Sequence, residues 1–145
     1  MAKSKNWQDM MEEWFGKLPS LPKGGRDVLA QVAPWFALIF GVLGVLAGLG
    51  GLGILSVLSP MMLLGSGLGT TANTLLSVAI ALVGSVLMLV AFPGLKKRKM
   101  QGWNLLFWSE AVSFVSSLVA FSFVGGVIGA LIGFYLLYQI KSYYK

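Results

Sequence analysis

One acidic side chain interrupts a long stretch that otherwise carries no formal charge. Glu110 is the only Asp, Glu, Lys or Arg between Lys99 and Lys141. Ser113 and Ser117 follow it at i+3 and i+7, and this spacing places all three side chains on one face of a helix. A carboxylate inside a membrane is costly and by default indicates a functional site. The pattern predicts a polar intramembrane site that titrates or holds a cation, with hydroxyls along the path.

The same carboxylate also has a structural interpretation. Glu110 follows Trp103 by seven residues, which is roughly 10 Å along a helix. At that depth it can reach interfacial water, the basic cluster at residues 96–99, or the hydroxyls and amide of the next helix. A transport path usually shows several polar groups at midplane or a broken helix. We therefore favour a structural or orienting role for Glu110 over transport.

The residue types that most enzymes need are missing from this chain. There is no cysteine and no histidine, and four of the five acids lie in the first 27 residues. The commonest general bases, nucleophiles and soft-metal ligands are therefore absent. We expect no enzyme activity, no catalytic residue, no cofactor and no metal. The basic residues flank apolar segments instead of forming one face with aromatics, so nucleic acid is not an expected partner.

Composition points to the bilayer as the solvent of this 145-residue chain. Hydrophobic residues make up 57% of it, charged residues 11%, and the mean hydropathy is +0.81. We predict an all-α integral membrane protein, a four-transmembrane-helix bundle in residues 32–145. The expected spans are 34–59, 70–92, 103–121 and 125–140. Pro60 should end the first span, an uncharged link should follow at 61–69, and a turn should lie around Gly125 and Gly126.

Residues 1–31 predict a cytoplasmic amphipathic helix and a linker ahead of the bundle. Apolar side chains recur there at helical spacing: Trp7, Met10, Met11, Trp14, Phe15 and Leu18. Asn6 is the expected N-cap. We expect this helix to lie in the headgroup region, where Trp and Phe are favourable. Because its polar face is acidic, docking on a basic surface of the same protein is the alternative.

Charge and aromatic residues agree on the orientation. Of the eleven Lys and Arg residues, five precede the first span, four lie between the second and third, and two follow the fourth. With four crossings all eleven fall on one side, as do every Trp and Tyr, which predicts cytoplasmic N- and C-termini. A bacterial inner (plasma) membrane is the expected location. The predicted lipid-interface residues are Trp7, Trp14, Phe15, Trp35, Lys96, Lys97, Arg98, Lys99 and Trp103.

Small residues at spacings of four form glycine-zipper seams in the expected spans. The helix-packing candidates are Gly44, Gly48, Gly125, Gly129 and Gly133. Such seams allow close helix contacts in lipid. They can serve the monomer or a second subunit, and we favour packing inside the monomer.

These observations lead to an interaction role as the first hypothesis. We expect an accessory or structural subunit that binds lipid headgroups and partner proteins, possible homo-oligomers included, through its cytoplasmic face. The alternative is a small oligomeric proton- or cation-coupled transporter or channel that uses Glu110. A holin-like permeabilising protein is a third, weaker hypothesis.

Overall fold

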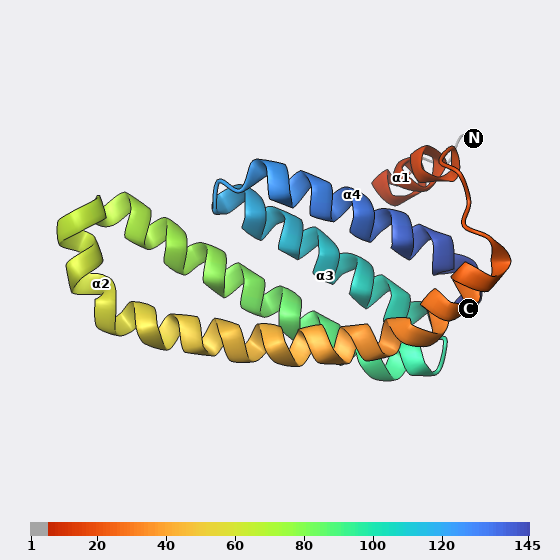
Figure 1. Ribbon diagram of the computed structural model, residues 1–145, viewed down its shortest axis with the longest axis horizontal. Helices are drawn as coiled ribbons and strands as arrows, with labels where there is room; N and C mark the ends of the chain where they lie inside the picture. Colours follow the sequence, from red (N-terminus) through yellow and green to blue (C-terminus); the bar gives the residue numbers. More distant parts are fainter. Residues whose placement is uncertain (1–5) are drawn as a thin grey trace.

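The computed structural model describes residues 6–145, and every regular element in that range is a helix (Figure 1). The elements are α1 (Trp7–Gly16), α2 (Lys23–Lys96), α3 (Met100–Val119), α4 (Phe123–Ile140) and the short 3-10 turn η1 (Lys141–Tyr143). Helix accounts for 89% of the structure. Two segments are long and apolar enough to cross a membrane, namely α2 and the segment Phe123–Tyr143. The predicted all-α fold is confirmed.

The 74-residue helix α2 folds back on itself at Gly67. Gly67 has φ +84° and ψ 168°, a backbone conformation that is strained for any residue with a side chain. We call residues 23–66 the first arm and residues 68–96 the second arm. The two arms run antiparallel, and α3 and α4 continue the up-and-down order beside them (Figure 1). The chain therefore forms four antiparallel helical segments after α1.

The first arm continues through Pro60, which differs from the predicted end of the first span. Proline has no N–H for the carbonyl four residues earlier, here that of Ser56. The Ser59 hydroxyl donates to this Ser56 carbonyl oxygen at 3.1 Å. The freed acceptor is thereby satisfied, and the helix proceeds to the break at Gly67. The predicted link at 61–69 is helical on both sides of that one residue.

Two other boundaries also differ from prediction. Helix α2 begins at Lys23, so the glycines of the predicted linker lie in its first turn. The chain reverses between α3 and α4 at residues 120–122, before Gly125 and Gly126. Phe121 takes the left-handed conformation there (φ 57°), and Ser122 N–H donates to the Ser117 carbonyl at 2.9 Å. This is a Schellman ending without glycine.

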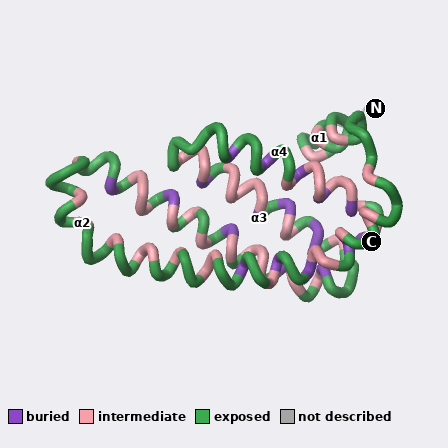
Figure 2. Tube along the Cα trace, viewed as in Figure 1, coloured by how far each residue is buried: buried purple, intermediate pink, exposed green. Residues whose placement is uncertain are grey.

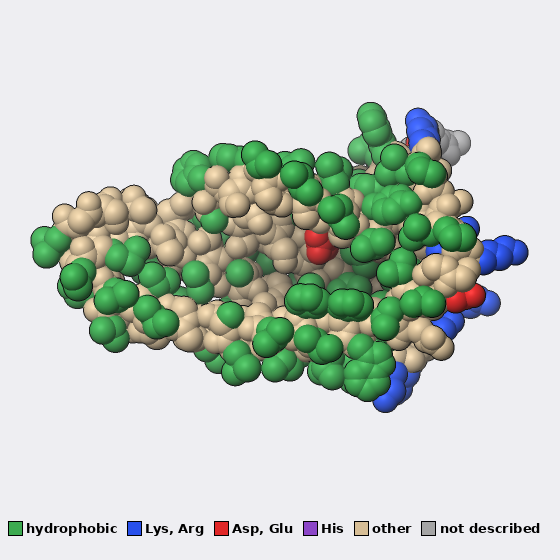
Figure 3. Space-filling model, in the orientation of Figure 1, with side chains coloured by type: hydrophobic (Ala, Val, Ile, Leu, Met, Phe, Trp, Pro, Cys, Tyr) green, Lys and Arg blue, Asp and Glu red, His purple; other side chains and the backbone are tan. Residues whose placement is uncertain are grey.

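Buried positions occur along the bundle, and the buried hydrophobic core lies toward one end of it (Figure 2). Lys and Arg side chains gather at the same end, which we call the basic end (Figure 3). Its fully buried large side chains are Leu95, Trp103 and Phe107. Trp103 Nε1 donates to the Leu137 carbonyl at 2.9 Å and so joins α3 to α4. The basic end therefore holds the most buried hydrophobic packing of the fold.

The opposite end is formed by the tip of the α2 hairpin alone. The hairpin extends past the α3–α4 turn (Figure 1) because α3 and α4 have only 20 and 18 residues. Side chains at the tip are exposed, and Leu64 is 92% exposed. Apolar side chains without protein neighbours are suited to contact with lipid.

Candidate functional site

A groove opens between the first arm of α2 and α4, with α3 as its floor (Figure 3). Its volume is about 340 Å³. Apolar side chains and one glycine line it, together with a single carboxylate: Leu29, Ala33, Phe36, Ala37, Phe40, Met88, Leu106, Glu110, Gly133, Leu136, Leu137 and Ile140. We call this the Glu110 groove.

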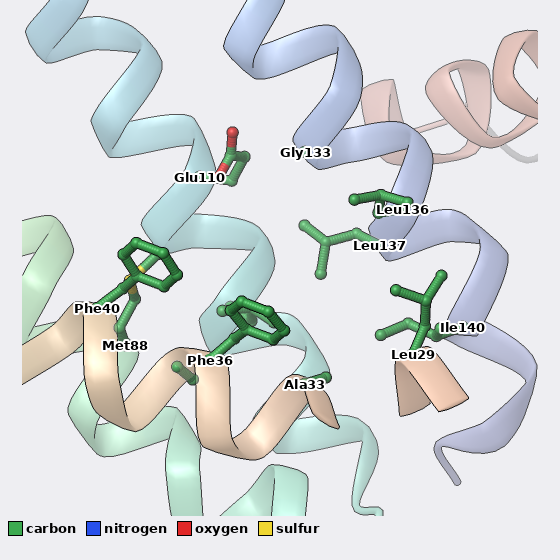
Figure 4. A pocket seen from close by; sticks show the side chains of 12 residues that line it. Leu29, Ala33, Phe36, Phe40, Met88, Glu110, Gly133, Leu136, Leu137 and Ile140 are labelled. Atoms are coloured by element: carbon green, nitrogen blue, oxygen red, sulfur yellow. The ribbon is translucent and has the colours of Figure 1, made fainter. Parts of the chain in front are cut away.

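Glu110 projects from α3 toward Gly133 of α4 (Figure 4). A Cβ atom added at Gly133 would collide with the Glu110 carboxylate, so the carboxylate occupies the space that the glycine leaves. Within residues 6–145 no donor forms a hydrogen bond or ion pair with this carboxylate. Glu110 is therefore partly buried in an apolar lining with no polar partner among the described residues.

The structure does not bring Ser113 and Ser117 into the groove with Glu110. Each hydroxyl donates to a carbonyl of its own helix, Ser113 to Ser109 at 2.9 Å and Ser117 to Ser113 at 3.0 Å. Their side chains lie against glycines of two different neighbours, Gly84 of the second arm and Gly126 of α4. The predicted polar stripe is therefore divided between two helix contacts.

Sequence reasoning did not single out a buried polar contact that joins α3 to the second arm. The Ser116 hydroxyl is buried and donates to the Ser77 carbonyl of the second arm at 2.8 Å. Neither Ser77 nor Ser116 is among the predicted site residues, and Ser116 lies one position before Ser117 of the predicted stripe. A one-residue offset on a helix changes the facing side by about 100°, so only the helix arrangement could identify this pair.

The predicted glycine seams lie in different environments. Gly44 and Gly48 contact Ser85 and Leu82, so they allow the two arms of α2 to approach closely. In α4, Gly129 has no atom within 4 Å of an added Cβ, whereas Gly133 faces Glu110. The first seam thus packs inside the chain, and the α4 seam is largely open.

The basic end holds a cluster of aromatic rings around Phe107. Trp7 and Trp103 lie with their ring centroids 5.3 and 5.5 Å from that of Phe107. Phe15 stacks on Tyr138 at 5.4 Å. The predicted lipid-interface residues Trp7, Phe15 and Trp103 therefore have protein partners.

The remaining predicted interface residues stay accessible. Trp14 is 75% exposed, and Trp35 is exposed beside Phe92 with ring centroids 6.3 Å apart. The basic cluster forms the turn between α2 and α3. Two of its members lie over aromatic rings, Lys96 over Phe92 and Arg98 over Tyr143, while Lys97 and Lys99 are exposed.

Helix α1 is attached to α4 by polar contacts as well as by rings. The Tyr138 hydroxyl donates to the Gln8 carbonyl at 3.1 Å, and Lys141 forms a salt bridge with Glu12. At the N-terminus of α1, Asn6 N–H donates to the Asp9 carboxylate at 3.2 Å. The side of α1 that carries Trp14 remains open, so this helix both docks on the protein and presents an apolar surface.

No protein-family model, curated protein or solved structure matches this chain. Within the described residues, no three His, Cys, Asp or Glu side chains come together as metal ligands would. Function has to be inferred from two features of the chain itself: the unpaired carboxylate in an apolar groove, and the aromatic and basic end beside it.

Proposed function

We propose that this protein is a membrane subunit that crosses the bilayer four times and binds a helix of a partner membrane protein in the Glu110 groove. Its basic end faces the cytoplasm and contacts anionic lipid headgroups. The observation that carries the proposal is the unpaired Glu110 carboxylate in a groove that is otherwise apolar.

Four crossings are supported by helix order and charge. Both arms of α2, α3 and α4 run antiparallel, and Lys and Arg gather at one end. The 20 residues of α3 correspond to roughly 30 Å, the thickness of the hydrocarbon layer. The positive-inside rule assigns the basic end to the cytoplasm, with both termini. A bacterial inner membrane suits this arrangement.

A protein helix fits the groove better than a lipid tail does. An acyl chain would complement the apolar lining but would leave the Glu110 carboxylate without a partner, at a cost of several kcal/mol. A helix with a Lys or Arg at that depth supplies both apolar contact and a cation that pairs with the carboxylate. A second copy of this chain could not supply a cation, because residues 28–95 and 100–140 contain no Lys or Arg. The expected partner is therefore a different membrane protein.

The cation-coupled transporter is the second candidate, since an unpaired carboxylate is also what a titrating site would need. Its support is weaker, because Glu110 is the only polar side chain in the groove lining. The hydroxyls of Ser113 and Ser117 donate within α3 instead of extending a path from Glu110. A binding role needs no such path.

Native mass spectrometry of the complex extracted from its own membrane tests the proposal. Wild type should carry a second membrane protein, Glu110→Leu should lose it, and Val115→Leu on an exposed part of α3 should keep it. The companion assay is proton or cation flux in liposomes. We expect no flux above empty liposomes for wild type or Glu110→Gln. Flux that is present in wild type and absent in Glu110→Gln would refute the subunit role and support the transporter.

A further inference from the structure

A second pocket lies at the basic end, between α1, the linker that follows it and the end of α4. Its volume is about 460 Å³, and both polar and apolar side chains line it. The lining residues that matter here are Glu12, Ser20, Arg26, Gln139, Lys141 and Tyr144. We call it the interfacial pocket. It is separate from the Glu110 groove, with which it shares no residue.

Tyr144 is the unexplained group in this pocket. The residue is only 2% exposed, and its hydroxyl forms no hydrogen bond with any described residue. Buried polar atoms nearly always have a partner, because leaving one unpaired loses the hydrogen bond it made with water. The hydroxyl is enclosed, so a ligand oxygen in the pocket supplies the missing partner once a neighbouring side chain moves aside.

The pocket has a small net positive charge. Lys141 is paired with Glu12 and lies over the rings of Trp103 and Tyr138. Arg26 is held in place because its Nε donates to the Leu21 carbonyl at 2.9 Å, and no carboxylate of residues 6–145 forms an ion pair with it. The formal charges of Glu12, Arg26 and Lys141 therefore sum to +1. Of the two basic side chains, Arg26 is the one that forms no ion pair with a described residue. A planar guanidinium is well suited to a phosphate group.

An apolar groove adjoins the interfacial pocket along the exposed side of α1. Its volume is about 580 Å³, and it is lined by Trp7, Met10, Met11, Trp14, Phe15, Leu18 and Leu131. Phe15 and Leu18 line both cavities, so polar and apolar surfaces meet at the end of α1. A soluble anion would use only the polar half. A phospholipid would use both.

We propose that this composite site binds one phospholipid whose headgroup has a single phosphodiester charge and free hydroxyls, as in phosphatidylglycerol. The phosphate meets Arg26 and the Tyr144 hydroxyl, and an acyl chain follows α1 past Phe15. A zwitterionic headgroup would add an ammonium to a pocket that is already positive. Glycerol hydroxyls instead match the amide and hydroxyls of Gln139 and Ser20. The inference rests on the proposed membrane location and deepens the proposed headgroup contact into a defined site.

Lipid titration by native mass spectrometry of the full chain in detergent tests this site. Phosphatidylglycerol should bind about tenfold more tightly than phosphatidylethanolamine. Arg26→Gln should lower the affinity for phosphatidylglycerol about tenfold, because it removes a charge-assisted contact. Lys97→Gln is the matched control, since it removes the same charge from the exposed α2–α3 turn and should leave the affinity unchanged.

Tyr144→Phe distinguishes a ligand-binding role of the Tyr144 hydroxyl from a purely structural one. Without lipid, this variant should unfold at the same temperature as wild type or a higher one, because it removes only an unpaired buried hydroxyl. It should nevertheless bind phosphatidylglycerol several-fold more weakly. Equal loss of affinity in Arg26→Gln and Lys97→Gln would mean general charge attraction and would overturn the site. Glycerol phosphate binding as tightly as the lipid would reveal a site for a soluble anion instead.

These outcomes are independent of the partner experiment on the Glu110 groove. If the chain shows no lipid selectivity but binds its partner, only the interfacial lipid site is refuted. If it shows lipid selectivity but binds no partner, only the proposed subunit role is refuted.

Discussion

Two glycines should respond in opposite ways to the same substitution. Gly102 of α3 lies against the backbone of the second arm, and a Cβ added there would lie 2.9 Å from Gly94 Cα and closer still to the Leu95 nitrogen. Backbone atoms cannot turn aside as a flexible side chain can. Gly129 of α4 has no atom within 4 Å of an added Cβ. Alanine therefore meets an obstacle at one position and open space at the other.

The expected magnitudes follow from these surroundings. Overpacking costs about 1–3 kcal/mol, and alanine recovers at most about 1 kcal/mol of helix propensity over glycine. Because the obstacle at Gly102 is backbone, its cost should lie at the upper end of that range, so Gly102→Ala should destabilise the protein by about 2 kcal/mol after the gain in helix propensity. Gly129→Ala should stabilise it by up to about 1 kcal/mol. The two variants should differ by up to about 3 kcal/mol although they change the same atoms.

Unfolding by sodium dodecyl sulfate in mixed micelles, followed by circular dichroism, measures both variants. Wild type should lie between them. If Gly102→Ala were as stable as wild type, the backbone contact between α3 and the second arm would be wrong. If Gly129→Ala were strongly destabilised, the α4 seam would be packed against something that the isolated chain does not contain.

Three further predictions concern the core, a turn and the proline. Phe107→Ala should lower the free energy of unfolding by about 3–5 kcal/mol. It should also loosen α1 and speed the amide exchange of residues 7–16, because the buried Phe107 ring contacts both α1 and α4. Unchanged exchange in α1 would refute the ring cluster. Phe121→Gly should raise stability by about 1 kcal/mol in the same unfolding assay, because the left-handed conformation (φ 57°) costs a residue with a side chain roughly 1–2 kcal/mol and the flexibility of glycine offsets part of that gain. A loss of stability would contradict the Schellman turn. Ser59→Ala should speed amide exchange around Pro60 with little change in global stability, and equal protection would show that the Ser59 hydroxyl does not replace the missing bond.

The sequence predicted those parts of the fold that depend on local spacing. Residues 7–18 have apolar side chains at helical intervals, and a helix is present at Trp7–Gly16 with Asn6 as its N-cap. The prediction that Pro60 ends the first span was wrong. Whether a proline ends a helix depends on whether another donor reaches the carbonyl that the proline leaves free, here that of Ser56. The Ser59 hydroxyl does so, and that contact follows from a side-chain rotamer instead of the residue order.

The sequence identified Glu110 as the central residue of the candidate site, but it did not predict the groove around it. Glu110 was identifiable because a lone acid in an apolar stretch is rare. The stripe of Ser113 and Ser117 was not sufficient, because α3 lies between two neighbours and one helical face contacts both of them. The groove itself arises from the separation of the first arm from α4, which is a property of tertiary packing. The interfacial pocket likewise joins residues more than one hundred positions apart, such as Ser20 and Tyr144.

Photo-crosslinking in the native membrane tests the central claim, that the Glu110 groove seats a helix of another protein. A crosslinking residue at Phe40 reports on the groove, and one at Val83 reports on the outer side of the second arm. The two positions are matched in exposure, 54% and 55%. We predict a crosslink to one other membrane protein from Phe40 and none from Val83, with the Phe40 product lost in Glu110→Leu. Equal products from both positions, or a Phe40 product that survives in Glu110→Leu, would contradict the claim.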